Sequence, residues 1–282
     1  MNTLENIHVL SLAINLPGPV AASRLVELGA RVTKIEPPSG DPLSHACPQW
    51  YKKLSHKQHI ITLDFKHPKD RNSLDEHLQH TDLLLTASRP KSLKTLGLDW
   101  ETLHARFPKL CQVAIVGYPP PKDNTPAHDL TCQATAGLLQ PPQLPRHLLS
   151  DLAGAERAVS SALAVLFLRQ KTGQAEYATV ALSDAAQIYK ECLKSGVTSP
   201  KGPLGGALAS YNIYPAQEGW VALAALEESF WKTLEKELNL DHPSTEDLKK
   251  VFATKPAHIW EQWAEKKDIP LVAIRRIHGD SH

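Results

Sequence analysis

The sequence has few features that would indicate a membrane protein, a metalloprotein or a disulfide-bonded protein. Its four cysteines, Cys47, Cys111, Cys132 and Cys192, are far apart and form no Cys-x-x-Cys pair, so neither a zinc site nor a disulfide framework is predicted. Free thiols are typical of the reducing cytoplasm. No apolar run approaches the roughly 20 residues that cross a bilayer, and the first residues have no charged segment of the kind that opens a signal peptide. We therefore expect a cytoplasmic protein with no metal and no membrane association.

An excess of charge of either sign is also missing. The 282 residues include 31 basic and 30 acidic side chains, a net charge of +1, and no basic block that would indicate nucleic acid as a partner. The 14 histidines are scattered, and no pair has the spacing of a zinc-binding helix. Hydrophobic residues make up 42% of the chain, which is ordinary for a globular protein of one large or two smaller domains.

Strand and helix patterns alternate along the first two thirds of the chain. Short apolar segments predict strands at 8–13, 31–37, 60–65, 82–88, 110–118 and 177–182. Helical patterns lie between them, and the longest, 151–173, ends at Gly173. This alternation predicts an α/β fold with a Rossmann-like, largely parallel sheet.

The pattern changes after a glycine- and proline-containing linker at 194–206. Residues 211–225 predict a hairpin, and 230–238 and 258–267 predict helices. We therefore expect a large domain at 1–198 and a smaller C-terminal α+β domain at 199–282.

The first strand, turn and helix also resemble a dinucleotide-binding unit, with Glu36 in the place of an acid that binds ribose. The turn Leu16-Pro17-Gly18-Pro19 contradicts this interpretation, because it has one glycine where the fingerprint needs three. Its two prolines also lack the N–H groups that would hold a pyrophosphate. A rigid turn is the better interpretation, and NAD is not expected.

Longer motifs carry a family resemblance. The stretch LPGPVAASRLVELGARVTKIEPPSGDP resembles the opening of the family III CoA-transferases (CaiB/BaiF), which include formyl-CoA transferase, carnitine CoA-transferase and α-methylacyl-CoA racemase. The likeness continues in order through ITLDFKHPKDR, SRPKSLKTLGLDWETL, AHDLTCQATAGLL, SDLAGAERAVSSALAVLFLRQKTGQ and VFATKPAHIWEQWAEKKDIPLVAI. The resemblance implies acyl-CoA thioester substrates, no cofactor other than the CoA that the substrate carries, and a homodimer of two interlocked chains.

The resemblance also assigns three catalytic residues. His128 matches the histidine of the racemases, Asp151 matches an aspartate at the start of a long helix, and Glu227 matches a glutamate of the small domain. In the transferases the aspartate is the nucleophile that carries CoA. Without the resemblance, Asp129 and Asp151 would be interpreted as helix caps and Glu227 as a surface residue; for Asp129 we keep the structural interpretation.

Two chemistries and one non-catalytic role are compatible with these residues. Moving an α-proton from one face of a thioester to the other needs two tuned acid–base groups, here His128 and Asp151, with Glu227 orienting the histidine. CoA transfer instead needs one carboxylate that attacks the thioester carbonyl. We favour 2-methylacyl-CoA racemase chemistry over CoA transfer through an Asp151–CoA thioester, and a degenerate CoA- or protein-binding relative is the third alternative. For CoA transfer a histidine is optional. We predict that His128 and Asp151 line a common cleft of the large domain, where the strands end.

CoA carries three phosphates, which arginine and lysine bind well. The resemblance assigns this role to Arg89 and Lys57, with Lys91 as a further candidate, although Lys91 and Lys94 also suit a solvated helix face. The segment around Lys57, Ser55 to Ile60, has lost two of the positive charges that the family pattern contains.

Three further departures concern loops and length. Prolines replace a glycine-containing loop at 117–126, and only Gly205 and Gly206 remain of the glycine-rich loop of the transferases, which favours racemase chemistry. The chain ends soon after 269–277, where relatives continue, so we expect an interlocked dimer to be incomplete or altered.

Overall fold

In the computed structural model, which describes residues 2–275, the chain divides into two compact units. One ends at Lys190 and the other begins at Glu191, so the division falls within helix α9 (Leu182–Lys194). Each unit has its own hydrophobic core and is described separately.

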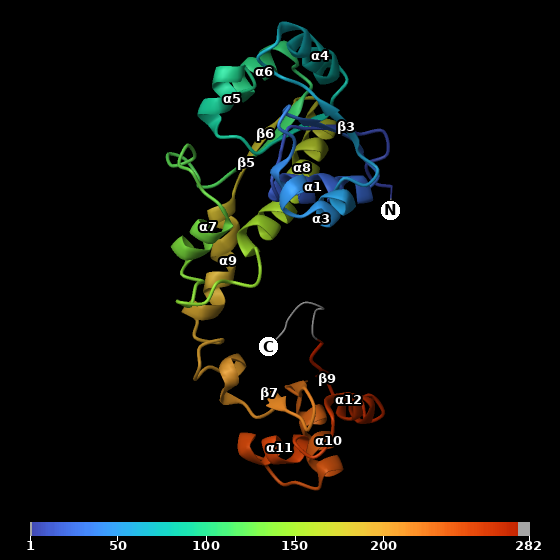
Figure 1. Cartoon of the computed structure of the whole chain (residues 1–282), viewed down its shortest axis with the longest axis vertical. Helices are drawn as coiled ribbons and strands as arrows, with labels where there is room; N and C mark the ends of the chain where they lie inside the picture. Colours follow the sequence, from blue (N-terminus) through green and yellow to red (C-terminus); the bar gives the residue numbers. More distant parts are fainter. Residues whose placement is uncertain (1, 276–282) are drawn as a thin grey trace. The chain divides into compact units, whose positions relative to one another are not determined.

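The first unit is built on a six-stranded parallel sheet in the order β3-β2-β1-β4-β5-β6. Figure 1 labels β3, β5 and β6 of this sheet. Its strands are β1 (His8–Ser11), β2 (Arg31–Glu36), β3 (His59–Thr62), β4 (Leu83–Thr86), β5 (Cys111–Val116) and β6 (Tyr177–Ala181). The strand order reverses between β1 and β4, which is the doubly wound arrangement. The predicted Rossmann-like α/β fold is confirmed.

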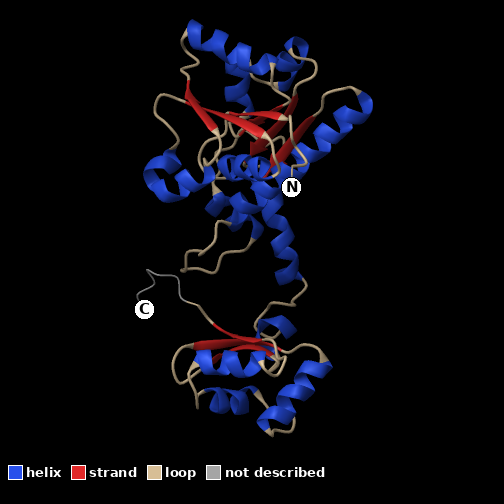
Figure 2. Cartoon of the chain, turned by 90° about the vertical axis from the view of Figure 1, so that its right-hand side faces the viewer, coloured by secondary structure: helices blue, strands red, loops and turns tan. Residues whose placement is uncertain are grey.

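Helices cover both faces of this sheet (Figure 2). On one face α1 (Pro17–Glu27) and α8 (Leu149–Thr172) pack against the strands and close the larger core. On the other face α4 (Pro68–Gln79), α5 (Pro90–Leu96) and α6 (Trp100–Arg106) bury their leucines. Because both faces are covered, central strands such as β4 are buried at every residue instead of alternating between buried and exposed.

Proline and glycine mark many of the helix ends. Pro68 begins α4, as predicted, and its missing N–H is tolerated there because the first turn has no intrahelical acceptor. Gly137 ends α7 (Asp129–Ala136) and Gly173 ends α8, each with a φ near +75° that glycine adopts without steric cost. Two short helices, α2 (Pro42–Ala46) and α3 (Pro48–Leu54), connect β2 to β3.

The second unit contains a three-stranded antiparallel sheet. Its elements are a short π-helix (Pro203–Ala207), β7 (Tyr211–Pro215), β8 (Trp220–Ala224), α10 (Glu228–Leu238), α11 (Thr245–Phe252), α12 (Ala257–Glu265) and β9 (Leu271–Ala273). One sheet face packs with the helices around Phe252 and Trp260. The predicted smaller α+β unit is confirmed, and α9, α11 and β9 are elements that the sequence patterns did not predict.

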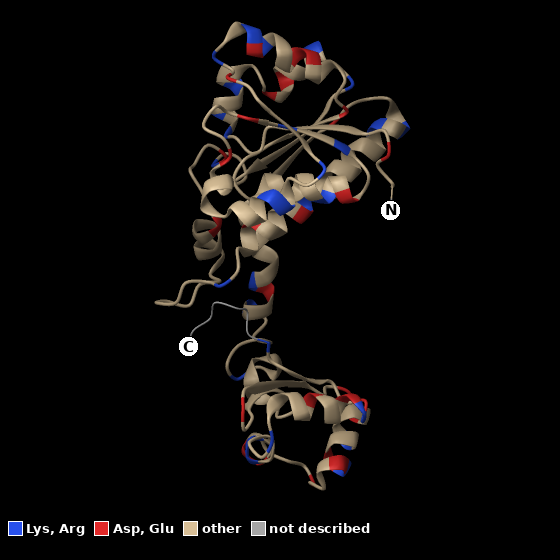
Figure 3. Cartoon of the chain, turned by 45° about the vertical axis from the view of Figure 1, so that its right-hand side comes forward, with Lys and Arg blue, Asp and Glu red and all other residues tan. Residues whose placement is uncertain are grey.

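Charged residues of both signs are interspersed along the helices of each unit, consistent with the near-zero net charge (Figure 3). Within residues 2–275, no helix is both long and apolar enough to cross a membrane. The same residues contain no cluster of three or more histidine, cysteine, aspartate or glutamate side chains arranged to hold a metal ion.

Candidate active site

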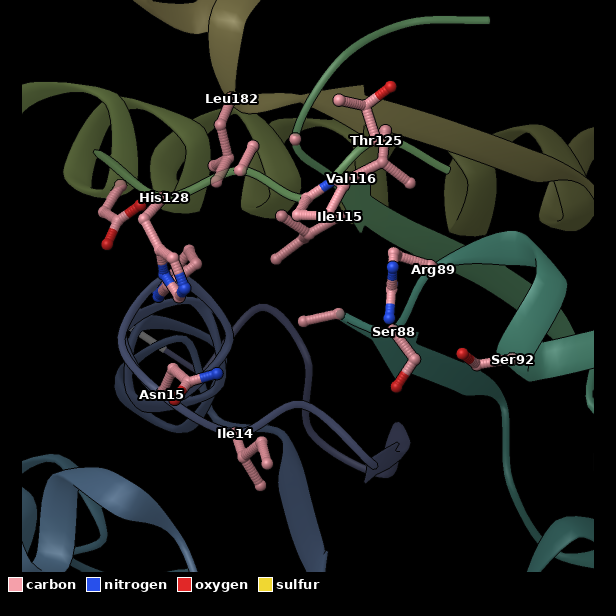
Figure 4. A pocket seen from close by; sticks show the side chains of 16 residues that line it. Ile14, Asn15, Ser88, Arg89, Ser92, Ile115, Val116, Thr125, His128 and Leu182 are labelled. Carbon is pink, nitrogen blue, oxygen red and sulfur yellow. The ribbon is translucent and has the colours of Figure 1, made fainter. Parts of the chain in front are cut away.

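A pocket of about 380 Å³ lies at the carboxyl ends of the central strands, where the strand order reverses. Three loops form most of it: the β1–α1 turn, the loop between β4 and α5, and the segment that follows β5. Asp151, near the start of α8, also lines it. Figure 4 shows His128 and Arg89 on opposite sides of this pocket. Open α/β sheets bind ligands at this position, because the loops diverge there and leave a crevice.

His128 enters the pocket as the residue that caps α7. Its backbone is fixed by Thr131, whose hydroxyl accepts a hydrogen bond from His128 N at 3.1 Å and donates one to His128 O at 2.8 Å. The side chain remains exposed. An imidazole that is held at its backbone and open at its ring is available to a substrate.

Asp129 is buried and joins α7 to the start of α8. Its Oδ1 accepts hydrogen bonds from Ser150 N at 2.8 Å and Asp151 N at 3.1 Å. Gln133 donates to Asp129 Oδ2 at 2.6 Å. Because Leu148 at the N-cap of α8 provides no side-chain cap, Asp129 satisfies amides that would otherwise lack acceptors. Asp129 therefore fixes the backbone that carries Asp151.

The Asp151 carboxyl has an altered acidity. Burial raises its pKa from 3.8 to about 7, and the nearby negative charge of Asp129 adds to the rise. Both the protonated and the ionised forms are therefore populated near neutral pH, as a group that alternates between acid and base or nucleophile requires.

Cys132 lies close to Asp151, but its side chain stays protonated at neutral pH. It is fully buried, and burial, followed by the charge of Asp151, raises the pKa of its thiol to about 11. Its Sγ donates to Gly117 O at 3.6 Å. A thiol that stays protonated at neutral pH is a poor nucleophile.

The predicted CoA-binding residues fall in different places. Arg89 lines the pocket, and Lys91 lines an adjoining hollow with Arg89, Ser92 and Asn124. Asn124 fixes the start of α5 by accepting from Lys91 N at 2.8 Å. Lys57 lies apart from them, in a hollow with Arg31 and other residues at the amino ends of β2 and β3. The structure therefore brings Arg89 into one pocket with His128 and Asp151, places Lys91 in the adjoining hollow, and brings Lys57 to neither.

Glu227 belongs to the second unit, where it immediately precedes α10 and is exposed. Its carbonyl accepts from Trp231 N at 3.0 Å. Its role beside His128 stays a prediction, as do the catalytic roles of His128 and Asp151.

Sequence reasoning missed two features of the site, the β1–α1 turn and a contact between distant residues. Ile14 and Asn15 line the pocket from this turn. Their position between the first strand and the Pro-Gly-Pro turn of a doubly wound fold could have identified them. The contact from Asp129 to the backbone of Asp151 had no local signal, because the two residues are 22 positions apart.

A family model and the sequences of known proteins indicate the same family. The family model described as CoA-transferase family III matches residues 4–279. The succinyl-CoA–D-citramalate CoA-transferase of Chloroflexus aurantiacus is 26% identical over 94% of this chain and 71% of its own length. The cinnamoyl-CoA:phenyllactate CoA-transferase of Clostridium sporogenes is 32% identical over 66% of this chain, a match that spans half of that protein.

Solved structures share the fold. The Mycobacterium tuberculosis protein Rv3272 superimposes with a TM-score of 0.83 at 22% identity, covering 98% of this chain and 86% of that one. A CaiB/BaiF family protein of Brucella suis gives a TM-score of 0.81 at 22% identity, covering 98% and 85%.

Proposed function

The chain belongs to CoA-transferase family III, and on that basis we propose that it moves CoA between carboxylic acids with Asp151 as the nucleophile. One observation carries the proposal: of the sixteen described residues that line the pocket, Asp151 alone has a carboxyl group. Its position at a fixed helix start and its pKa of about 7 suit a nucleophile, because a more basic carboxylate attacks a carbonyl more readily and is still partly ionised at neutral pH.

The proposed reaction is balanced without any added reagent. An oxygen of the Asp151 carboxylate attacks the thioester carbonyl, the C–S bond breaks, and CoA leaves as a thiolate while a mixed anhydride of Asp151 and the first acid forms. The thiolate then attacks the carbonyl of Asp151, which releases the first acid and leaves an Asp151–CoA thioester. The acceptor's carboxylate attacks the carbonyl of that thioester, the C–S bond breaks, and a second mixed anhydride forms as the CoA thiolate is released. The thiolate then attacks the acceptor's carbonyl, which forms the acceptor's CoA thioester and releases the Asp151 carboxylate.

Arg89 and the first turn of α7 are the groups that would support these steps. Arg89 supplies a positive charge for the CoA phosphates or a substrate carboxylate. The first turn of α7 starts at His128, and the amides of a helix start favour the oxyanion of a tetrahedral intermediate. His128 would assist by orienting the substrate.

A second candidate is α-proton transfer in a 2-methylacyl-CoA. The observation that favours it is the presence of His128 and Asp151 in one pocket, because racemisation needs two acid–base groups. The two relatives named above are CoA-transferases, so they give no support to the preference for racemase chemistry drawn from the sequence motifs.

One experiment separates the candidates. The protein is incubated with succinyl-CoA or cinnamoyl-CoA and a panel of free carboxylic acids, and in parallel with a 2-methylacyl-CoA in heavy water. Transfer predicts ping-pong kinetics and an Asp151 adduct that hydroxylamine traps. Racemisation predicts deuterium at Cα and a loss of about 100-fold or more in His128→Ala. Transfer that persists in Asp151→Asn would contradict the first candidate, and absence of both activities would favour a non-catalytic binding protein.

We also propose that the protein is a cytoplasmic homodimer whose second unit supplies Glu227 to the chemistry. The support is the family resemblance alone. Sedimentation equilibrium tests the dimer, and a Glu227→Gln variant with unchanged kcat and KM would contradict the role of Glu227.

A further inference from the structure

A buried ionic cluster lies next to the pocket and takes no part in the chemistry above. Lys34 on β2 is only 1% exposed, and its Nζ lies 2.8 Å from Glu36 Oε1 and 2.5 Å from Asp41 Oδ2. Asp41 is fully buried. We call Lys34, Glu36, Asp41 and Tyr51 the Lys34 cluster.

Tyr51 completes the cluster from α3. Its hydroxyl donates to Glu36 Oε1 at 2.7 Å, and Lys34 Nζ lies 4.8 Å from the centre of its ring. Burial and the bond to Glu36 raise the pKa of Tyr51 to about 12, so the hydroxyl remains a donor over the working pH range. Each charged group is therefore paired or hydrogen-bonded.

The cluster reaches the pocket through Asp41. Its Oδ1 accepts from Asn15 N at 3.0 Å and from Leu43 N at 2.9 Å. Asn15 lines the pocket and has a φ of 72°, a left-handed conformation that costs energy in most residues. The following turn has little freedom, because a Cβ added at Gly18 would lie 2.1 Å from Ala13 Cβ.

Stability alone gives a weak reason for such a cluster. A buried ion pair commonly contributes no more than well-packed apolar residues of the same volume would, because desolvation offsets the attraction. What Asp41 provides specifically is a hydrogen-bond acceptor for the amide of Asn15.

We propose that the Lys34 cluster is a positioning device in which Lys34 holds the Asp41 carboxylate against the Asn15 amide, so that Ile14 and Asn15 keep their places in the pocket. This positioning proposal rests on the proposed function only in the experiments that measure catalysis. Asp41 acts through the turn, and it is a positioning residue.

The sharpest test is a matched pair of double variants, Lys34→Met/Asp41→Asn and Lys34→Met/Asp41→Leu. Both remove the same charges, and asparagine and leucine share the branched four-atom side chain of aspartate. Only the asparagine retains an oxygen for the Asn15 amide. Hydrogen exchange of the 12–20 segment is measured together with kcat and KM per trappable active site, with the 158–168 segment of α8 as the internal reference.

We expect the asparagine variant to keep slow exchange at Asn15 and near-normal kinetics. The leucine variant should exchange faster in 12–20 alone and lose on the order of 10- to 100-fold in kcat/KM, the usual consequence of a displaced pocket segment. Equal behaviour of the two variants, or an equal rise in exchange in 158–168, would overturn the proposal.

A measurement on the unmodified protein covers the case in which either variant fails to fold. Fast exchange of the Asn15 amide in wild-type protein would also overturn the positioning role. If wild-type protein shows no CoA transfer, the proposed function fails, while the exchange data still decide whether the cluster holds the turn.

Discussion

Replacing Asp129 by asparagine should show how strongly the charge of Asp129 affects the pKa of Asp151. Asp129 Oδ1 accepts the Ser150 and Asp151 amides, and an asparagine can keep that oxygen in place while losing the charge. The substitution therefore alters the electrostatics of Asp151 more than its position.

The structure sets limits on the size of the effect. The pKa of Asp151 rises from 3.8 to about 7, with burial as the larger of two causes and Asp129 as the smaller. Asp129 thus accounts for less than half of the rise, so Asp129→Asn should lower the pKa of Asp151 by no more than about 1.5 pH units. Because attack requires the ionised form, the acid limb of kcat/KM should move down from about pH 7 by the same amount.

A structural cost should accompany this shift. The new side-chain NH₂ would face the Gln133 amide that now donates to Asp129 Oδ2, and two donors cannot bond to each other. Gln133 must turn over and give up its bond to His147 O, which should lower stability by about 1 kcal/mol.

The assay is the pH profile of kcat/KM for CoA transfer, with the pH dependence of hydroxylamine trapping as a second readout of Asp151 ionisation. Asp241→Asn, at an exposed carboxylate of the second unit, is the control and should leave the midpoint unchanged. An Asp129→Asn midpoint that stays at pH 7 or moves upward would refute the coupling.

Three other predictions use the same pocket. Since the folded-state pKa of Asp151 is raised, the free energy of unfolding falls as the pH rises from 3.8 to about 7. Asp151→Asn should therefore melt above wild type, and its gain in stability should be larger at pH 8 than at pH 5 by roughly 2 to 3 kcal/mol. An equal gain at both pH values in calorimetry would contradict this. Arg89→Ala should raise KM for acyl-CoA more than it lowers kcat, whereas Lys57→Ala, at the other end of the strands, should change neither; equal effects in steady-state kinetics would argue against the assignment. Because attack of a carboxylate on a thioester transfers no electrons and needs no Lewis acid, dialysis against EDTA should leave the transfer rate unchanged, and restoration of a lost rate by added metal would disprove the point.

The fold was predictable where hydrophobic pattern and turn residues agree. The buried strand β4 begins with three consecutive leucines, and Pro68 and Gly173 mark helix ends by their backbone preferences. Helix α9 was missed because it follows β6 at Ala181 with no intervening turn residue. Helix α11 was missed although Ser244 and Asp247 form a capping box, a signal that closer attention to caps would have found.

Strand direction separates the predicted CoA-binding residue that reaches the pocket from one that does not. Arg89 follows β4 and reaches the pocket, whereas Lys57 precedes β3 and therefore lies at the opposite edge of the parallel sheet. A match between sequence motifs does not show at which edge of the sheet a residue lies. The direction of the neighbouring strand does. Contacts between distant residues, such as Asp129 with Asp151, depend on how α7 packs against α8 and leave no trace in a local pattern.

Asp129 and Asp41 hold pocket segments in the same way but differ in their electrical surroundings. Both are buried and accept two backbone amides through one oxygen. The second oxygen of Asp129 meets the neutral amide of Gln133, whereas that of Asp41 meets the ammonium of Lys34. The charge of Asp129 therefore acts on Asp151, while Lys34 offsets the charge of Asp41 locally.

This difference predicts a split between rate and pH dependence. The Lys34→Met/Asp41→Leu variant should lower kcat/KM and leave the acid-limb midpoint near pH 7, since the Asp151 surroundings are unchanged. Asp129→Asn should move the midpoint and alter the pH-independent rate far less. Complete pH profiles of both variants test this, and a moved midpoint in the Asp41 variant would mean that the Lys34 cluster acts on Asp151 electrically and not through the turn.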